Sequence, residues 1–314
     1  MTLADLINEY VEYKRSLGML FRSPAVRLRA FLGAVGDVNL NLITPEQVRR
    51  HLDGKPGPVT SLWFAKYEAL RPFFAYAIDR KHLTTCPLPK VLPRKPKKFD
   101  PYIYTVAEVK RLLDAADSRH QSDWLLDPRT ARTLVLLLYG TGLRIGEATR
   151  LKLKDVDLND QIITIRETKF FKSRLVPVGD DLAKALRSYL AWQWGSWDVT
   201  EESTFLSCRN RRPIKHQTAR LVFYRMRAEA KVSREKTARY QPRLHDFRHT
   251  FAITRLVTWY REGKNVQRLL PHLSTYLGHA RLQDTARYLE MTKELMREAS
   301  QCFQRYALPE ASDE

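Results

Sequence analysis

The sequence contains few cysteines, and their arrangement excludes two kinds of cross-link. Cys86, Cys208 and Cys302 lie far apart in a chain of 314 residues. Their number is odd and they do not have the spacing of metal ligands, so we expect neither disulfides nor a zinc site. Such sparse use of cysteine fits the reducing cytoplasm.

Long apolar runs are absent as well, and so is a targeting segment. No stretch is apolar and long enough to span a bilayer, and the first residues, MTLADLINEYVEYKRSLG, read as a helix with early acidic residues. A signal peptide would begin with positive charge and continue with an apolar segment. We therefore predict a cytoplasmic protein with no membrane partner.

Nucleotide-binding motifs are missing too. The glycines form neither a GxxxxGK[ST] loop nor a dinucleotide fingerprint. No cluster of carboxylates stands out as a metal site. We therefore expect chemistry that needs no cofactor, neither ATP nor a metal ion.

Positive charge is what the sequence has in excess. It contains 54 Lys and Arg against 35 Asp and Glu, which gives a formal net charge of +19. A surplus of this size repels itself and is best tolerated beside a polyanion, so nucleic acid is the expected partner. The composition, 44% hydrophobic and 28% charged, is that of a folded globular chain, and the length suggests two domains.

Helical periodicity dominates residues 1–89, which we predict to form a helical DNA-binding domain. Apolar residues recur at helical spacing over 3–18, 24–36, 44–52 and 59–82, with Thr44 as a candidate N-cap before Pro45. Pro72 should kink the last helix. Its aromatic side chains are better explained as core than as a platform for stacking bases. They are Trp63, Phe64, Phe73, Phe74 and Tyr76.

A basic, proline-rich segment at residues 90–104 is predicted to be an extended linker between the domains. Five prolines interrupt TTCPLPKVLPRKPKKFDP, and its cations have no acid between them. Such charges repel one another unless phosphates lie alongside, so we expect the linker to contact DNA; an ordinary solvated linker is the alternative. The candidate contacts are Lys90, Arg94, Lys95, Lys97 and Lys98.

A second basic stretch lies between Arg209 and Arg243. It contains 12 Lys and Arg against two Glu. This excess makes the stretch a second candidate surface for phosphate binding. The cations at its start, which we take as candidate DNA contacts, are Arg209, Arg211, Arg212 and Lys215.

Residues 105–314 are predicted to form a mainly helical domain with a small β-hairpin. The segments QIITIRE and RLVPVG are rich in β-branched residues and flank TKFFKS, which is the pattern of a hairpin. Helical patterns occur before it in DPRTARTLVLLLYGTG and RIGEATRLKLKDVDL, and after it up to a last helix. The apolar positions of that last helix are Leu295, Met296, Ala299, Phe303 and Tyr306.

Four short motifs carry the residues that could perform chemistry. Each is weak by itself, because an arginine after a glycine-rich turn usually lies on the surface and a tyrosine on an amphipathic helix is usually structural. His245 and Arg248 are three residues apart, which places both on one face of a helix. The motifs are GTGLRIGEATRL with Arg144, TKFFKSRLVP with Lys169, LHDFRHTFA with His245 and Arg248, and LGH with His279, followed by Tyr288.

Together, these residue types suit a reaction at a phosphodiester. Arginine forks match the charge and geometry of a phosphate and could thereby replace a metal ion. A tyrosine has a pKa of about 10, but neighbouring positive charge stabilises its phenolate, so the same arginines could activate Tyr288 as a nucleophile. Attack on phosphorus would expel a sugar oxygen, which a lysine or histidine could protonate.

In this order, the motifs resemble those of the tyrosine recombinase (phage integrase) family of site-specific DNA recombinases over roughly residues 105 to 305. The resemblance implies a two-domain clamp around double-stranded DNA at recombination sites, made of a helical core-binding domain and a catalytic domain. It also implies that a homo-tetramer joins two duplexes. Strands would then exchange through a 3′-phosphotyrosine and a Holliday junction.

The resemblance assigns a role to each phosphate ligand. Arg144 and Arg248 would clamp the scissile phosphate, and Glu147 would support Arg144. His279 would be a further phosphate ligand. The whole set would then hold one phosphate in front of the nucleophile.

It also assigns the residues that move protons. Tyr288 would be the nucleophile and His245 the acceptor of its proton. In the hairpin, Lys169 would protonate the departing 5′-oxygen, with Lys172 as the competing candidate. In this family a C-terminal segment commonly docks on a neighbouring protomer, so the last helix either does this or completes the core.

Two other functions stay open. A type IB topoisomerase uses similar residues to relax supercoils as a monomer, and the separate LGH histidine argues against it. An accessory DNA-binding protein could keep the fold without catalysis, and the presence of all the expected side chains argues against that.

Overall fold

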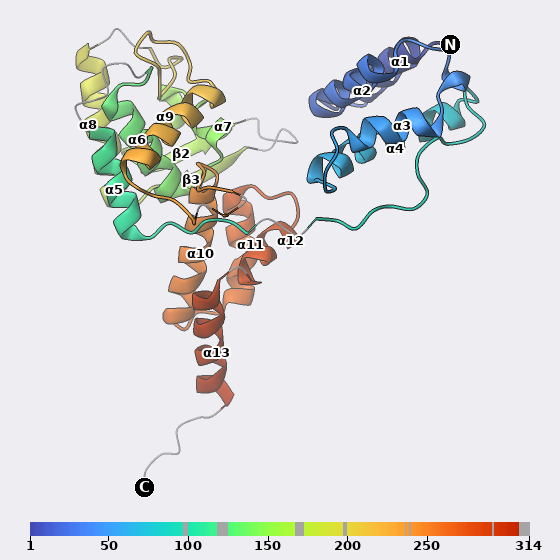
Figure 1. The fold of residues 1–314 in the computed structure, drawn as a ribbon. Coiled ribbons are helices and arrows are strands. Elements are labelled where there is room, and N and C mark those ends of the chain that lie inside the picture. Colours follow the sequence, from blue (N-terminus) through green and yellow to red (C-terminus); the bar gives the residue numbers. More distant parts are fainter. Residues whose placement is uncertain are drawn as a thin grey trace. The chain divides into compact units, whose positions relative to one another are not determined.

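The computed structural model describes residues 1–96, 100–117, 125–166, 173–196, 200–235, 237–238, 240–290 and 292–307. The chain divides into two units, Met1–Phe99 and Asp100–Glu314, both drawn in Figure 1. Each unit has its own apolar core. The finer division predicted from the sequence, with a linker at 90–104, stays a prediction.

The first unit is built of helices, as its periodicity indicated. Its elements are α1 (Leu3–Ser16), α2 (Arg22–Val35), the short 3-10 helix η1 (Leu40–Leu42), α3 (Pro45–Asp53) and α4 (Ser61–Asp79). Thr44 caps α3: its hydroxyl accepts from the Gln47 backbone, and the Gln47 side chain accepts from the Thr44 backbone. The predicted N-cap is therefore confirmed, with a reciprocal capping box.

The aromatic residues of α4 belong to the core of this unit. Phe73 and Phe74 are fully buried and Trp63 is 6% exposed. Phe64 and Tyr76 pack against the same cluster from its edge. The interpretation of these rings as core is confirmed, and α4 runs through Pro72 as one helix from Ser61 to Asp79.

The second unit combines helices with a small three-stranded sheet (Figure 1). This mainly helical fold confirms the predicted fold class. No helix within the described ranges is both long and apolar enough to cross a membrane. The elements are α5 (Val106–Asp117), α6 (Pro128–Thr141), α7 (Ile145–Ala148), η3 (Leu153–Asp155), β1 (Val156–Asp157), β2 (Ile162–Ile165), β3 (Arg174–Pro177), α8 (Asp180–Ser196), α9 (His216–Glu229), α10 (Asp246–Arg261), α11 (Val266–Leu277), α12 (Gln283–Ala286), η4 (Arg287–Glu290) and α13 (Lys293–Ala307).

The sheet contains the predicted hairpin. Its order is β1-β2-β3 with antiparallel pairing throughout, and Ile163 of β2 lies opposite Val156 on one side and Val176 on the other. Ile163 and Ile165 are buried while their neighbours are half-buried, so one face of β2 meets the core. The residues that join β2 to β3, 167–172, lie outside the described residues.

The helix predicted across RIGEATRLKLKDVDL is wrong beyond its first turn. α7 ends at Ala148, and a 3-10 turn and the short strand β1 follow. The backbone of this segment bonds to a distant one: the N–H of Phe205 donates to the Leu151 carbonyl at 2.7 Å, and that of Leu153 to the Ser203 carbonyl at 3.0 Å. These tertiary hydrogen bonds replace the helical ones and override the local pattern.

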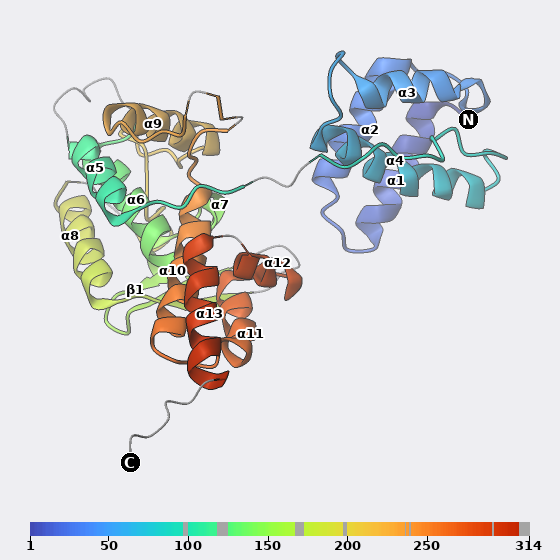
Figure 2. The same ribbon diagram turned by 60° about the horizontal axis from the view of Figure 1, so that its bottom comes forward.

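The C-terminal helices form a second apolar cluster in this unit. α13 packs against α10 (Figure 2), and Leu295 of α13 is fully buried in the same cluster as Tyr288. Arg261 of α10 bonds to Glu294 and Glu298 of α13 at 2.8 and 2.9 Å. α13 therefore completes the core of its own chain, and docking on a neighbouring protomer stays a prediction.

Candidate active site

A cavity of about 670 Å³ opens in the second unit between α7, β3, α10 and the turn that follows α11. Three predicted site residues line it: Arg144, His245 and His279. Two more, Arg248 and Tyr288, are buried beside them, with 2% and 3% of their surface exposed. Folding thus brings five of the six predicted catalytic residues together.

The remaining predicted cations are only partly described. Lys169, Lys172, Lys97 and Lys98 lie outside the described residues. The other candidate DNA contacts are all exposed, in keeping with a role in binding. They are Lys90, Arg94 and Lys95 in the first unit, and Arg209, Arg211, Arg212 and Lys215 before α9 in the second.

Arg144 stands at the start of α7, where the glycine-rich turn ends. α6 is capped by the glycine that follows it, Gly142, whose φ of +62° favours glycine and whose absent Cβ leaves room for Phe251. The guanidinium of Arg144 donates to Glu147 Oε1 and to the Gly278 carbonyl, each at 2.9 Å. These two bonds hold the arginine at the cavity wall.

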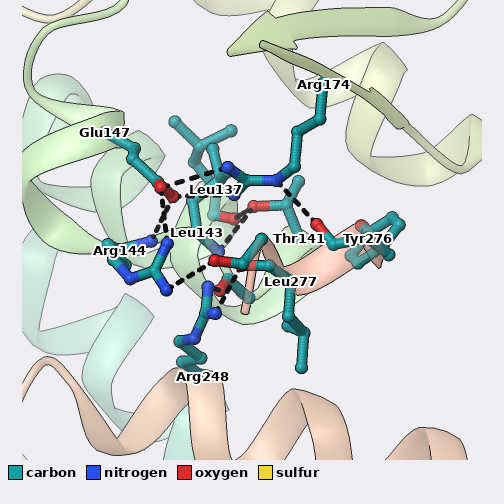
Figure 3. A network of polar contacts seen from close by, with 11 residues as sticks. Leu137, Thr141, Leu143, Arg144, Glu147, Arg174, Arg248, Tyr276 and Leu277 are labelled. Carbon is teal, nitrogen blue, oxygen red and sulfur yellow. Dashed lines mark hydrogen bonds and ion pairs between the residues drawn. The ribbon is translucent and has the colours of Figure 1, made fainter. Parts of the chain in front are cut away.

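A second arginine, Arg174 at the start of β3, shares the same carboxylate (Figure 3). Its Nη1 and Nη2 donate to the two Glu147 oxygens at 3.1 and 2.8 Å, and its Nε donates to the Tyr276 carbonyl at 2.7 Å. Burial raises the pKa of Glu147, but the hydrogen bonds and charges of Arg174 and Arg144 outweigh it and lower the pKa to about 2. Sequence reasoning did not single out Arg174, although it lies within the SRLVP of the hairpin.

Arg248 is a buried cation in the first turn of α10. Its Nη1 donates to the Gly142 carbonyl at 3.0 Å and its Nη2 to the Leu277 carbonyl (Figure 3). Burial and then the charge of Arg144 lower its pKa to about 10, so it stays charged at neutral pH. Because carbonyls carry no net charge, the positive charge of Arg248 remains available to an anion.

The HDFRH segment supplies two histidines where one was predicted. His245 lines the cavity, and its ring centroid lies 5.0 Å from that of His249. The His249 ring lies 5.5 Å from the Tyr288 ring, at 62° to it. Nδ1 of His249 is buried and has no hydrogen-bond partner among the described residues. Sequence reasoning missed His249, because its contact with the tyrosine appears only in the folded chain.

Burial and nearby positive charge keep both histidines neutral. Burial, followed by the charges of Arg243 and Arg248, lowers the pKa of His249 to about 4. Burial and then His249 also lower the pKa of His245. Because His245 is the more exposed residue, solvent should make its shift the smaller. A neutral imidazole can accept a proton.

His279 follows the end of α11 and faces Tyr288 from the other side. Its Nδ1 is 2.7 Å from the hydroxyl oxygen of the fully buried Thr285, which leaves Nε2 as the nitrogen available to a ligand. The His279 and Tyr288 rings are stacked at 23°, with centroids 6.1 Å apart. Burial, followed by the charges of Arg248 and Arg144, lowers the pKa of His279 to about 3.

Tyr288 lies on η4 between these groups. Burial raises its pKa, and the charge and hydrogen bond of Arg248, with the charges of Arg287 and Arg144, offset only part of the rise. In this structure burial therefore outweighs the stabilisation of a phenolate that the arginines provide. The phenol needs a proton acceptor, and neutral histidines stand on both sides of it.

Sequence comparison finds similar chains of known type. The sequence model of the phage integrase family matches residues 103–294. The chain is 35% identical over 311 residues to the protein y4rB of Sinorhizobium fredii, which bears an integrase/recombinase name, and the match covers 97% of this chain and 98% of that one. It is 33% identical over 237 residues to the tyrosine recombinase XerA of Thermococcus kodakarensis, covering 74% and 72% of the two chains.

Solved structures share the fold at lower identity. The integrase of transposon Tn1549 in complex with transposon right end DNA has a TM-score of 0.70 at 18% identity, covering 98% of this chain and all of that one. A lambda integrase tetramer bound to a Holliday junction has a TM-score of 0.64 at 19% identity, covering 90% and 78%. At these identities the likeness concerns the fold.

Proposed function

Since this chain belongs to the phage integrase family of site-specific DNA recombinases, we propose that it cuts and rejoins DNA through a covalent bond between Tyr288 and a 3′-phosphate. One observation carries the proposal: Arg144 and His279 line one cavity, and Arg248 and Tyr288, from two further elements, are buried beside it. The three cationic or polar ligands suit a phosphate, and the phenol beside them suits an attack on it.

In the first step a phosphodiester enters the cavity and is bonded by Arg144, Arg248 and the free nitrogen of His279. The phenolic oxygen of Tyr288 attacks phosphorus, so that a tyrosine–phosphate bond forms as the bond to the 5′-oxygen breaks. Negative charge grows on the non-bridging oxygens during this step. The two arginines stabilise it without the reorganisation that water would require.

Two protons move during the same step. The proton of the phenol passes to a neutral histidine, for which His245 is the proposed acceptor because it lines the cavity. The departing 5′-oxygen takes a proton from Lys169 of the hairpin. The products are a 3′-phosphotyrosine and a free 5′-hydroxyl.

In the second half of the reaction the 5′-hydroxyl of a partner strand attacks the phosphotyrosine and releases Tyr288. The covalent bond conserves the energy of the cut linkage, so ATP is not required. Four protomers on two duplexes would pass through a Holliday junction, and the fold shared with a lambda integrase tetramer bound to such a junction supports this. Such an enzyme would act on DNA in the cytoplasm.

Exposed cations in both units are proposed to bind the DNA backbone. Lys90, Arg94 and Lys95 in the first unit and the cations before α9 in the second have no role in the apolar cores. Contacts of this kind fix the position of a protein on the duplex but do not read its sequence.

The covalent adduct is the first prediction. We expect wild-type protein to form a 3′-linked adduct on a nicked duplex that carries the recombination site, because the short fragment with the 5′-hydroxyl diffuses away and religation stops. Tyr288→Phe should abolish the adduct, since the nucleophilic oxygen is gone. A denaturing gel with 3′-end analysis measures both.

Tyr189→Phe is the matched control, because it removes a phenolic oxygen that bonds to Thr130 elsewhere in the same unit. It should leave the adduct intact. If Tyr288→Phe still forms an adduct, another residue is the nucleophile. Specific DNA binding without any adduct would favour the accessory DNA-binding protein instead.

A further inference from the structure

We propose that Arg174 is a positioning residue, which holds Arg144 and the His279 turn in the geometry required for cleavage. The inference rests on the proposed function, since it assigns Arg174 to the support of phosphate ligands. Arg174 also lines the cavity, but three of its five N–H groups donate to Glu147 and Tyr276, and its guanidinium pairs with both oxygens of a carboxylate. We therefore assign it to the support of Arg144 and not to the phosphate.

Arg174 ties three elements of the site together (Figure 3). Its side chain starts on β3, bonds both oxygens of Glu147 in α7, and bonds the Tyr276 carbonyl near the end of α11. Only 9% of the side chain is exposed. A buried, planar fork with partners on two sides fixes their separation more firmly than a flexible point charge would.

Of the two groups that bond Arg144, Arg174 bonds one directly and lies beside the other. One is Glu147, whose oxygens accept from both guanidinium groups. The other is the Gly278 carbonyl, which lies two residues after the Tyr276 carbonyl that Arg174 bonds. Arg174 therefore sets the position of Arg144 from two directions.

The turn that carries His279 is packed against the same guanidinium. A Cβ at Gly278 would lie 2.8 Å from Arg174 Nη1 and 3.0 Å from its Cζ. Gly278 immediately precedes His279, so a movement of Arg174 would also displace His279, the proposed phosphate ligand. Small displacements of this kind are costly in a site that depends on orientation.

The test measures cleavage and DNA affinity separately, in the full-length protein. Arg174→Lys keeps the charge but cannot bond Glu147 and Tyr276 as a fork. We expect it to slow single-turnover adduct formation roughly 10- to 100-fold while the dissociation constant for the site changes by less than about threefold. Arg174→Gln, measured in parallel, should be slower still, because the glutamine side chain is uncharged and offers a single amide group in place of the guanidinium.

Arg132→Lys is the matched control for stability. Arg132 also bonds one carboxylate, Asp117, and one backbone carbonyl, that of Leu113, but it lies on α6 away from the cavity lining. We expect this variant to cleave at the wild-type rate. If the Arg174 variants lose cleavage only in proportion to their unfolded fraction, measured by thermal unfolding, the residue is merely structural and the proposal is overturned.

A double-mutant cycle shows whether Arg174 acts through Glu147. Arg174→Lys should slow cleavage much less in a Glu147→Gln background than in wild type, because the shared partner is already lost. Rate losses that simply multiply would overturn the proposal.

The outcomes separate the two proposals. A wild-type protein without a Tyr288 adduct would sink both of them. An adduct that depends on Tyr288 but forms at the wild-type rate in folded Arg174→Lys and Arg174→Gln would sink only the role of Arg174.

Discussion

Burial sets the protonation of the residues around Tyr288. The phenol has a raised pKa, while the pKa values of His249 and His279 are lowered to about 4 and about 3. The histidines are therefore neutral near pH 7 and free to accept a proton. Burial also widens the pKa gap between the phenol and its acceptor, so the positive charge of Arg248 and Arg144 is needed to stabilise the phenolate.

These histidines predict that stability falls as the pH is lowered from 6.5 towards 4.5. An unfolded histidine takes up a proton near its ordinary pKa of 6.5, while His249 and His279 in the folded protein stay neutral to about 4 and about 3. The unfolded state then binds more protons, so stability rises with pH in this window and is lost as the pH falls. Thermal unfolding midpoints between pH 7 and 4.5 measure the effect.

A histidine variant checks the cause of the pH effect. His249→Asn should flatten the dependence of the midpoint on pH, whereas His272→Asn, an exposed position on α11, should leave it unchanged. Glu147, whose pKa is lowered to about 2, contributes a further loss of stability only at pH values below 4.5, the ordinary pKa of its carboxyl group. Equal slopes in both variants would refute the assignment to His249.

The motifs predicted the residue types of the site better than their partners. Arg144, Arg248, His279 and Tyr288 were recognisable because their order along the chain resembles a family. Arg174 was not, because a hairpin arginine is usually exposed and only the fold reveals that it meets Glu147.

At the scale of elements, the turn after α11 gives a sharp prediction. Gly278 has φ +64° and a Cβ there would collide with Arg174, whereas Gly263 has φ +65° and nothing within 4 Å. Alanine should cost about 1 kcal/mol at either position because of the left-handed backbone. At Gly278 we expect a further loss of about 1–3 kcal/mol, because three hydrogen bonds prevent Arg174 from moving aside.

Urea unfolding of Gly278→Ala and Gly263→Ala measures this difference, and cleavage assays should show a loss in Gly278→Ala alone. If both variants had the same free energy of unfolding, Arg174 would be able to move away from the added Cβ at little cost. That result would also weaken the case for Arg174 as a fixed support.

In helix α13 we expect two neighbouring residues to differ in their contribution to stability. Leu295 is fully buried against α10, and Met296 is 56% exposed. Leu295→Ala should lower the free energy of unfolding by about 2–5 kcal/mol, because it leaves a cavity. Met296→Ala should change it by less than about 0.5 kcal/mol. Urea unfolding would contradict this picture if both substitutions cost the same.

Periodicity and caps predicted the elements whose hydrogen bonds are local. α3 begins at its expected cap, and β2 and β3 flank the expected turn. The region after α7 was mispredicted, because Leu151 and Leu153 find their backbone partners at Phe205 and Ser203. Backbone pairing between segments about 50 residues apart in the sequence cannot be predicted from a local pattern.

At the scale of the whole molecule, the charge of +19 predicts a strong dependence of DNA binding on salt. If the protein neutralises at least about six phosphates, affinity should fall roughly 1,000-fold or more between about 50 and 200 mM salt. Replacing Lys90 and Arg94 together by glutamine should reduce the logarithmic slope by about two. A titration series at several salt concentrations measures both, and a flat response would exclude extensive phosphate contacts.

Composition predicted the class of partner, because net charge is a sum over the chain, and periodicity predicted the mainly helical fold, because it is a local pattern. The site could not be assembled in this way, because its residues converge from α7, α10, the turn after α11 and η4. The family resemblance predicted which residues belong to one site. Only the fold shows the supporting contacts that Arg174, His249 and Thr285 make with them.

The order of the site residues along the chain also has a consequence during protein synthesis. Arg144 is made first, Arg248 and His279 later, and Tyr288 last of the described site residues. Leu295, which packs into the same cluster as Tyr288, follows it. The cluster around Tyr288 therefore cannot close until α13 has been made, so the proposed nucleophile takes its place only at the end of synthesis.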